Sequence, residues 1–459
     1  MRNGSLNRKP TDAAMAVSPL SRISPAVLAL AVFFAVAVLF TALLALPISA
    51  ADGRMTPFHD ALFTAFSAVT VTGLVSLDTA THWSFFGQFV ILLAIQIGGL
   101  GIVTIALLLS RAVTRSFGVR SRIFAQQGIG TNKLGEVQSL LRIVVLTTLV
   151  IEGALAAVLM PAFILAEESV PLGAWHAVFY SVSAFNNAGF AANEGGLAAF
   201  DGDLWILVPI MIGVFVGSFG FPVFLVLMLS RHHWRRWSLH AKLTLTVTTA
   251  LMLVGALIWG LLEWGNPDTI GGMSTGEKLF HALFASVMMR SGGFSLVDPA
   301  ASESVTLLAT DALMFVGGGS ASTAGGIKVT TIAILFLAIV AEAKGDRDVM
   351  VFGRTLPQGA LRVAISVTFL GATLVLGGTA AIMLVSDEPL DRILFEVISA
   401  FATCGLSVGL SEQLTPAGKY ILAALMFAGR IGPIGLASAL AIRRRNLQFR
   451  YPEETPVIG

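Results

Sequence analysis

The chain alternates between long apolar runs and shorter polar links. About 20 apolar residues in a helix cross the roughly 30 Å hydrocarbon core of a bilayer. Five uncharged runs are this long: Ile23–Ala51, Ser84–Ser110, Leu204–Ser230, Leu243–Leu262 and Val363–Ser386. Three more apolar stretches, 143–166, 312–340 and 421–442, each carry one ionisable residue, namely Glu152, Lys328 and Arg430. The pattern predicts an all-α integral membrane protein with eight spans.

A shorter apolar stretch lies between the two spans of each pair and ends in Gly followed by Leu or Phe. These stretches run from Phe58 to Leu74, Trp175 to Phe190, Leu279 to Phe294 and Pro389 to Leu406. Their apolar cores of roughly 10 to 14 residues are too short to cross a bilayer, so each is predicted to form a re-entrant helix.

The glycines that end these stretches recur at nearly even steps. Gly73, Gly189, Gly293 and Gly405 follow one another at intervals of 116, 104 and 112 residues. Such repetition marks duplicated units, and it predicts four tandem repeats of span, pore loop and span between two tails. The predicted bounds are 1–22 for the first tail, 23–115, 116–237, 238–345 and 346–445 for the repeats, and 446–459 for the last tail.

The third repeat departs from the spacing of the others. Phe63, Phe179 and Phe395 precede their glycines by ten residues, and Ser67, Ser183 and Ser399 by six. In the third repeat, Phe284 is nine residues ahead of Gly293. Either its loop is one residue tighter or the alignment is shifted there.

Four such units can surround one pseudo-fourfold pore. After each re-entrant helix the backbone must turn back as an extended strand, whose carbonyl groups can replace an ion's hydration shell. Glycine at that turn permits conformations that a Cβ atom forbids, and the C-terminal ends of four short helices add partial negative charge that favours a cation. A single Gly-Phe or Gly-Leu pair is more typical of helix packing, but four copies at equivalent places favour a cation pore.

A glycine-rich segment interrupts the sixth predicted span. Residues 317–328 read GGGSASTAGGIK, with five glycines among twelve residues, and this composition disfavours a continuous helix. Irregular backbone at membrane depth is tolerated where it is buried in protein or lines a water-filled cavity. The segment is therefore predicted to be a gate below the filter, with a tightly packed helix crossing as the alternative. Its candidate residues are Gly317, Gly318, Gly319, Ser320, Ser322, Thr323, Gly325, Gly326 and Lys328.

Arg430 lies within the eighth predicted span, in the sequence GRIGP at 429–433. A charge at that depth costs roughly 2.5–3.5 kcal/mol on insertion scales, so a partner or a function is expected. Snorkelling to the cytoplasmic surface is the alternative, but twelve residues, about 18 Å of helix, separate Arg430 from Ile442. We therefore predict that Arg430 lies beside the pore, where it opposes cations or fixes the gate. Lys328 could equally be an interface anchor, and Glu152 could simply pair with a neighbouring helix.

Composition excludes a soluble enzyme as the leading interpretation. The 459 residues are 55% hydrophobic and 12% charged, against roughly 25% charged residues in ordinary soluble domains. No His, Cys or carboxylate cluster lies within a span, and the single cysteine, Cys404, excludes an intramolecular disulfide. The net charge of +2 gives no reason to invoke nucleic acid. Basic residues gather in every second link and acidic residues in the others, which predicts cytoplasmic termini and an outer mouth that attracts cations.

Together these motifs resemble those of the Trk/Ktr/HKT superfamily of potassium- and sodium-translocating subunits, over nearly the whole chain. The motifs are TVTGL at 70–74, NNAGF at 186–190, RSGGF at 290–294, GGGSASTAGGIK at 317–328, TCGL at 403–406, GRIGP at 429–433 and YPEE at 451–454. The chain is most similar to the bacterial Ktr membrane subunit.

The resemblance implies a potassium filter built from the residues around the four glycines. Carbonyl groups of the two residues before each glycine would coordinate K+, with Thr70 beside them, and Arg430 would be the pore-adjacent arginine. The coordinating residues would be Val71, Thr72, Asn187, Ala188, Ser291, Gly292, Thr403 and Cys404. Glycine at all four filter positions favours potassium, since some plant sodium-selective relatives carry serine in the first.

The resemblance also implies partners and a location. These are a homodimer in the cytoplasmic (inner) membrane, in contact with lipid and docked on a cytosolic ring of nucleotide-binding regulatory subunits. It implies K+ as the transported ion, Na+ as a candidate activator, and no organic cofactor in this chain. Two alternatives stay open: a sodium-translocating subunit with the same pore, and a cation-coupled secondary transporter, which predicts helix breaks at matched positions of two halves.

Overall fold

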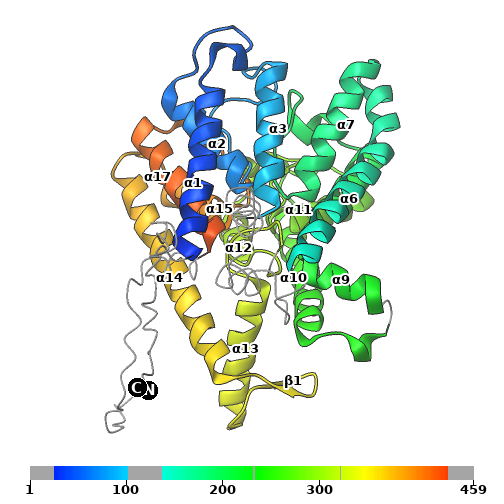
Figure 1. Ribbon diagram of the computed structural model, residues 1–459, viewed down its shortest axis with the longest axis vertical. Helices are drawn as coiled ribbons and strands as arrows, with labels where there is room; N and C mark the ends of the chain where they lie inside the picture. Colours follow the sequence, from blue (N-terminus) through cyan, green and yellow to red (C-terminus); the bar gives the residue numbers. More distant parts are fainter. Residues whose placement is uncertain (1–24, 102–136, 231–232, 321, 433–459) are drawn as a thin grey trace, which may run out of the picture.

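The computed structural model describes residues 25–101, 137–230, 233–320 and 322–432, and the regular structure within these ranges is predominantly helical (Figure 1). A two-stranded antiparallel hairpin, β1 (Met350–Val351) with β2 (Arg354–Thr355), is the exception. The two predicted tails, the part of the second predicted span after Gly101, and the YPEE motif lie outside the described residues.

The described helices fall into four successive groups, here called units 1 to 4, each of which contains one of the four predicted re-entrant stretches. Unit 1 contains α1 (Pro25–Leu44), α2 (Phe58–Thr70) and α3 (Phe85–Gly99). Unit 2 contains α6 (Val137–Ala166), α7 (Val170–Phe185), α8 (Leu204–Gly217) and α9 (Phe221–Ser230). Unit 3 contains α10 (Leu239–Glu263), α11 (Thr275–Met288), α12 (Ser304–Phe315) and α13 (Val329–Lys344). Unit 4 contains α14 (Gln358–Met383), α15 (Leu390–Ala402), α16 (Leu410–Gln413) and α17 (Pro416–Ile431).

Three helices of the described part are long and apolar enough to cross a membrane. They are Val144–Ala166 within α6, Leu239–Glu263 and Gln358–Met383. Shorter apolar helices cover Ala29–Leu44, Phe85–Gly99, Leu204–Gly217 and Ser304–Phe315. The apolar helices fit a membrane protein of several spans, and the number eight stays a prediction.

One predicted span is not a single helix. The uncharged run Leu204–Ser230 is divided into α8 and α9 by Ser218, Phe219 and Gly220. Gly220 has a φ of +86°, outside the right-handed helical region, and the carbonyl of Ser218 accepts a hydrogen bond from Gly319 N–H at 2.8 Å. The predicted span therefore consists of two helices, and the break between them contacts a distant segment of the chain.

That distant segment, residues 316–328, separates α12 from α13 and is here called the central loop. It contains the glycine-rich sequence, and none of its described residues is helical. Val316 and Ile327 form a parallel bridge at its base, and Gly317 N–H donates to Ile327 O at 2.9 Å. The two ends of the loop therefore lie side by side.

The four units pack against one another in a closed order. α3 contacts α7, α8 contacts α11, α12 contacts α15, and α17 contacts α2, so that unit 4 lies next to unit 1. A buried ion pair joins these two units, because Lys419 Nζ of α17 lies 2.6 Å from Asp60 Oδ1 of α2 and both side chains are only 7% exposed. The four units therefore form a closed ring, and each contributes one of the helices α2, α7, α11 and α15, which cover the predicted re-entrant stretches and are called the short helices below.

Local sequence explains where the short helices begin. Pro171 lies in the first turn of α7, where its missing N–H costs no helical hydrogen bond. Ser274 and Glu277 form a capping box at the start of α11. Glu277 Oε2 accepts from Ser274 N–H at 2.8 Å, and this bond, with a second one to the Ser274 side chain, lowers the pKa of Glu277.

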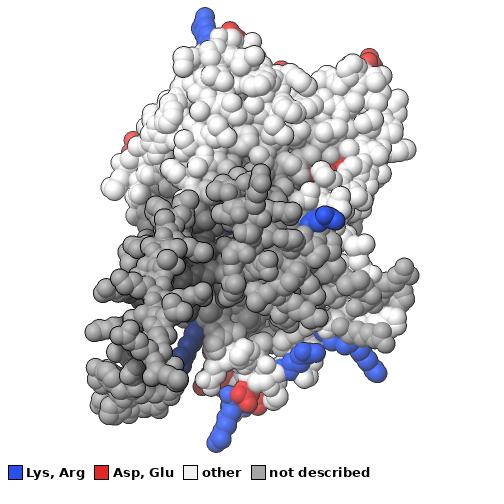
Figure 2. All heavy atoms as spheres, viewed as in Figure 1, with Lys and Arg blue, Asp and Glu red and all other residues white. Residues whose placement is uncertain are grey.

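On the upper part of the described surface in Figure 2, charged side chains are few. Lys and Arg side chains gather along its lower edge, where Figure 1 places β1 and the end of α13.

Candidate functional site

The four short helices lead into the same unusual backbone turn. The residue two positions before each glycine has a positive φ, which is 57° at Val71, 60° at Asn187, 71° at Ser291 and 47° at Thr403. A side chain in this left-handed region costs roughly 1–2 kcal/mol. Such strain persists where the surrounding structure imposes it, and it clusters at functional sites.

The glycines that follow these turns lie close together at the centre of the four units. A Cβ atom added to Gly73 would lie 2.3 Å from Ala188 O of unit 2. A Cβ added to Gly189 would lie 2.8 Å from Gly293 Cα of unit 3. Unit 1 thus touches unit 2, and unit 2 touches unit 3, through positions that admit no side chain.

Units 3 and 4 close the ring in the same manner. A Cβ added to Gly293 would lie 2.7 Å from Cys404 O, and one added to Gly405 would lie 2.2 Å from Thr72 O. We call Gly73, Gly189, Gly293 and Gly405 the glycine ring. In three of its four contacts the nearest atom is the carbonyl oxygen of the residue just before a glycine, so these oxygens face the ring.

The ring offers ligands to a monovalent cation but not to a transition metal. Rings of backbone carbonyl groups replace the hydration shell of an ion in channel filters. In the described ranges, no group of three or more His, Cys, Asp or Glu side chains could hold a metal ion. The ligands that the ring presents are therefore backbone carbonyl oxygens.

Serine hydroxyls tie the ring to three of the short helices. Ser67 Oγ accepts from Gly73 N–H, and Ser399 Oγ accepts from Gly405 N–H, both at 3.1 Å. The hydroxyl of Ser183 instead donates to Phe190 O at 2.8 Å. In unit 1, the hydroxyls of Thr70 and Thr72 also lie 2.7 Å apart.

Unit 3 builds its turn one residue tighter. Gly292 N–H donates to Met288 O at 2.7 Å, a reach of four residues. The equivalent N–H groups of the other units reach back five residues, to the carbonyls of Ser67, Ser183 and Ser399. A tighter third turn thus accounts for the shifted Phe284, and no serine hydroxyl bonds to Gly293 N–H.

Arg290 lies at the start of the third turn and is only 3% exposed. Its Nη1 donates to Thr248 O of α10 at 2.8 Å, and its Nη2 donates to Gly317 O of the central loop at 3.3 Å. Nε has no partner among the described residues. A buried guanidinium thus connects the third turn with the central loop.

The central loop crosses the axis on the helix-end side of the glycine ring. Thr323 Oγ1 donates to Asn187 Oδ1 of unit 2 at 2.6 Å. A Cβ added to Gly325 would lie 1.9 Å from Thr403 Oγ1 of unit 4. Since units 2 and 4 lie on opposite sides of the ring, a loop that touches both passes beneath it.

Arg430 and Lys328 both bond to carbonyl groups of the central loop. Arg430 Nη1 donates to Thr323 O, and its Nη2 donates to Gly98 O at the end of α3 at 2.7 Å. Lys328 Nζ donates to Ala324 O at 2.6 Å and lies 3.4 Å from Gly325 O. Arg430 therefore connects the loop to unit 1, and Lys328 folds back onto the loop itself.

The remaining predicted residues lie at the edge of this arrangement. Ser322 Oγ donates to Gly319 O at 2.7 Å, within the central loop. Ser320 Oγ and Thr330 Oγ1 lie 3.1 Å apart at its base. Glu152 of α6 accepts from Asn186 Nδ2 at 2.7 Å, so it pairs with a residue next to the second turn.

Sequence reasoning missed Glu396, which lies inside the short helix α15. Its Oε1 accepts from Ser407 Oγ at 2.8 Å and from Ser411 N–H at 3.1 Å, and its Oε2 accepts from Val408 N–H at 3.3 Å. The carboxylate thereby holds the link that follows Gly405. A carboxylate within a short apolar helix was the available signal, because such a group must find partners.

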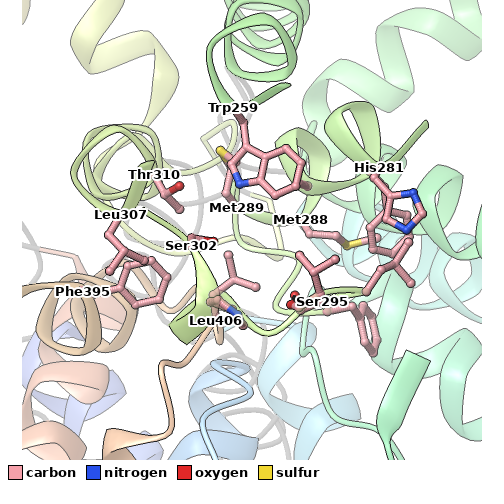
Figure 3. Close-up of a pocket in the computed structure, with 16 residues that line it drawn as sticks. Trp259, His281, Met288, Met289, Ser295, Ser302, Leu307, Thr310, Phe395 and Leu406 are labelled. Carbon is pink, nitrogen blue, oxygen red and sulfur yellow. Dashed lines mark hydrogen bonds between the residues drawn. The ribbon is translucent and has the colours of Figure 1, made fainter. Parts of the chain in front are cut away.

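A cavity lies behind the third turn, in the place that corresponds to Glu396 (Figure 3). Glu396 follows Phe395 on α15, whereas Ala285 follows Phe284 on α11 and lines the cavity. Figure 3 shows Met288, Met289, Leu307 and Leu406 around this space, whose volume is about 40 Å³. Unit 3 therefore lacks both the serine and the side chain that supports the link after its glycine.

Comparison with known proteins finds relatives over most of the chain. Residues 25–446 match the family model TrkH, cation transport protein. Ktr system potassium uptake protein B of Bacillus subtilis is 36% identical over 434 residues, which cover 94% of this chain and 95% of that protein. Potassium/sodium uptake protein NtpJ of Enterococcus hirae is 34% identical over 444 residues, covering 95% and 98% respectively. These matches confirm the resemblance to the Trk/Ktr/HKT superfamily that the motifs indicated.

Among solved structures, the potassium transporter TrkH from Vibrio parahaemolyticus is similar to this chain. The TM-score is 0.71 at 18% sequence identity, covering 89% of this chain and 84% of that chain. At this identity the likeness speaks for the fold alone. It confirms the prediction of a predominantly helical membrane protein.

Proposed function

The chain belongs to the TrkH family of cation transport proteins, and on that premise we propose that it is the ion-translocating membrane subunit of a potassium uptake system. The relatives to which it is similar are ion transporters, and it is likewise a transporter and not an enzyme. The observation that carries the proposal is the glycine ring, toward which Thr72, Ala188 and Cys404 direct their carbonyl oxygens. Four backbone strands that meet at one axis form the kind of site that coordinates a monovalent cation.

In this proposal K+ passes through two layers of carbonyl oxygens. One layer comes from the residues with positive φ and the other from the residues just before the glycines. The layers are Val71, Asn187, Ser291 and Thr403, followed by Thr72, Ala188, Gly292 and Cys404. The C-terminal ends of four short helices near this path add partial negative charge, which favours a cation.

The central loop is proposed as the gate. It crosses the axis beside the ring, so an ion cannot continue along that axis until the loop moves. Arg430 and Arg290 hold the loop through the carbonyls of Thr323 and Gly317. Each arginine bonds a neutral acceptor, so its positive charge also opposes a cation nearby.

Units 1 to 4 are proposed to be four repeats of one pore-loop module, with the bounds expected from the glycine spacing. We propose eight spans, of which the fourth and sixth are broken, with both termini in the cytoplasm. The names of the relatives are compatible with a homodimer that a separate cytosolic subunit regulates, since Ktr is described as a system. Na+ as an activator remains part of the same proposal.

Two observations weigh on the alternatives. A coupled transporter with broken helices predicts breaks at matched positions of two halves, whereas in the described residues α3, α8, α12 and α17 each end inside a predicted span, a pattern that follows the four units. An inward positive charge gains about 2.3 kcal/mol per 100 mV, so electrical driving force suffices for uptake. The sodium alternative is supported by the name of the Enterococcus hirae relative, which includes both ions.

The test is a substitution in the glycine ring. Gly73→Ser places a Cβ atom 2.3 Å from Ala188 O at a φ of +96°, so the ring must distort. Gly377→Ser in α14 is the matched control, because a Cβ there would meet nothing within 4 Å. Each variant is expressed, with a Ktr regulatory subunit, in a bacterial strain without its own potassium uptake, and growth on low K+ and uptake of Rb+ and Na+ are measured.

We expect the parent chain and Gly377→Ser to restore growth and take up Rb+. Gly73→Ser should lose Rb+ uptake or shift it toward Na+. Uptake of Na+ without Rb+ by the parent would favour the sodium alternative. Absence of uptake of both ions, with the protein present in the membrane, would contradict the proposal.

A further inference from the structure

Asn187 differs from its counterparts in the contacts of its side chain. In the first turn the equivalent residue, Val71, has no polar side-chain atom. In the third, Ser291 Oγ reaches only Ala402 O, at 3.4 Å. In the fourth, Thr403 Oγ1 has no hydrogen-bond partner within the described ranges. Among the four residues with positive φ, Asn187 alone bonds to the central loop through its side chain.

The Asn187 amide connects three parts of the molecule. Nδ2 donates to Ser218 Oγ at 2.9 Å and to Val214 O at 3.2 Å, where α8 ends. Oδ1 accepts from Thr323 Oγ1 of the central loop at 2.6 Å. Asn187 is fully buried, so the protein alone supplies these hydrogen bonds. One side chain thus links the second turn, the break between α8 and α9, and the loop.

Thr323 has other acceptors within reach, but its shortest contact is with Asn187. Its hydroxyl lies 3.0 Å from Gly217 O and 3.3 Å from Phe185 O. A threonine hydroxyl donates one proton, and the 2.6 Å contact with Asn187 Oδ1 is the closest of the three. The position of the loop therefore bears directly on the orientation of the Asn187 amide.

A small cavity lies beside Thr323. Its volume is about 10 Å³, roughly the room that one water molecule needs, and it is lined by Thr323 together with residues of α6, α8 and α9. Gly217 and Gly220, which lie at the break between α8 and α9, belong to this lining. The contact between Thr323 and Asn187 therefore lies beside a helix break.

We propose that Asn187 is the positioning residue that couples the central loop to the second strand of the filter, so that displacement of the loop changes ion selectivity as well as the rate of passage. This inference rests on the proposed function as a cation pore. Without the Thr323 hydroxyl, Asn187 Oδ1 loses its hydrogen bond to the central loop. The strained turn at Asn187, and with it Ala188 O in the ring, then loses a constraint.

The test compares the same change, Thr to Val, at one position in the central loop and at one position in α13. Thr323→Val removes the hydroxyl that bonds to Asn187. Thr330→Val removes a hydroxyl that bonds instead to Ser320, at 3.1 Å, and that does not contact the filter. Thr323→Ser restores the hydroxyl, and Thr323→Ala removes it without the bulk of valine. The ratio of Rb+ to Na+ uptake is measured for each variant. The purified protein is also heated in KCl and in NaCl, and greater resistance to heat in KCl shows that the variant is folded.

We expect Thr323→Val and Thr323→Ala to lower the Rb+ to Na+ ratio by about 2- to 10-fold, the range that one net hydrogen bond supplies. Thr323→Ser should restore the ratio, and Thr330→Val should leave it unchanged. A change in total uptake with an unaltered ratio would overturn the coupling and leave the pore intact. An equal fall in Thr330→Val would overturn it as well. A parent chain that passes neither ion and gains no stability from KCl would overturn the proposed function and this inference together.

Discussion

The fourth and third turns show two ways of supporting the same backbone reversal. In unit 4, Ser399 accepts from Gly405 N–H, and Glu396 holds the link after the glycine through three acceptor contacts at 2.8 to 3.3 Å. In unit 3, the main-chain carbonyl of Met288 accepts from both Gly292 and Gly293, and a cavity lies where Glu396 would be. Both turns have backbone hydrogen bonds, but a side chain accepts from the ring glycine in the fourth turn and a backbone carbonyl does so in the third.

The difference shows that the ring itself does not require equal support in every unit. Both turns have a residue with positive φ followed by a glycine with positive φ, and both glycines contact their neighbours closely. The common geometry is imposed at the centre by these contacts. The hydrogen bonds and packing around each turn differ. The third turn lies next to a cavity, and its Arg290 bonds to the central loop.

The largest effect is expected at Glu396. Glu396→Ala would leave the buried N–H groups of Val408 and Ser411 without an acceptor, at about 1–3 kcal/mol for each group. The fraction of folded protein after heating in detergent, and the amount in the membrane, measure this loss. Glu388→Ala is the control, because Glu388 is a third exposed and its contact with Arg392 is 3.9 Å long, so its effect should stay within about 0.5 kcal/mol. Equal stability of the two variants would show that the fourth turn does not depend on the carboxylate.

A smaller effect is expected at the serines that bond to the ring. Ser399→Ala leaves one buried N–H, that of Gly405, without its acceptor, which costs about 1–3 kcal/mol, and it should lower the ratio of Rb+ to Na+ uptake. Ser286→Ala on α11 is the matched change in unit 3, where the hydroxyl donates to Met252 O at 2.6 Å and does not contact the ring. If both variants lowered the ratio equally, the serine would not be what distinguishes the fourth turn from the third.

The repeated features were predictable because they depend on local sequence. The ends of the short helices follow from apolar stretches too short to cross a bilayer, and the four glycines follow from their spacing. Even the odd third turn was indicated by the nine-residue interval between Phe284 and Gly293. That these residues bind potassium stays a prediction, since their arrangement alone does not identify the ion.

The features that were not predictable depend on partners far along the chain. In the run Leu204–Ser230, Pro222 is a local signal for an interrupted helix, but the contact of Ser218 O with Gly319 N–H could not be read from the sequence. Arg430 was expected to need a partner, but Thr323 O and Gly98 O lie 107 and 332 residues away. Glu396 was overlooked because its partners belong to a link whose path only the folded chain defines.

The smallest effect is expected from filling the space behind the third turn. Ala285→Leu adds apolar atoms at the cavity of about 40 Å³ that Ala285 lines. Filling a cavity commonly adds stability, here about 0.5–1 kcal/mol. Resistance to heating in detergent should rise slightly, and the ratio of Rb+ to Na+ uptake should stay at least as high as in the parent.

Ala282→Leu on the same helix is the control. Ala282 is only 4% exposed and packs against Gly260, so overpacking should cost about 1–3 kcal/mol. Were Ala285→Leu as damaging as Ala282→Leu, the third turn would be as closely supported as the fourth, and the contrast between them would fail.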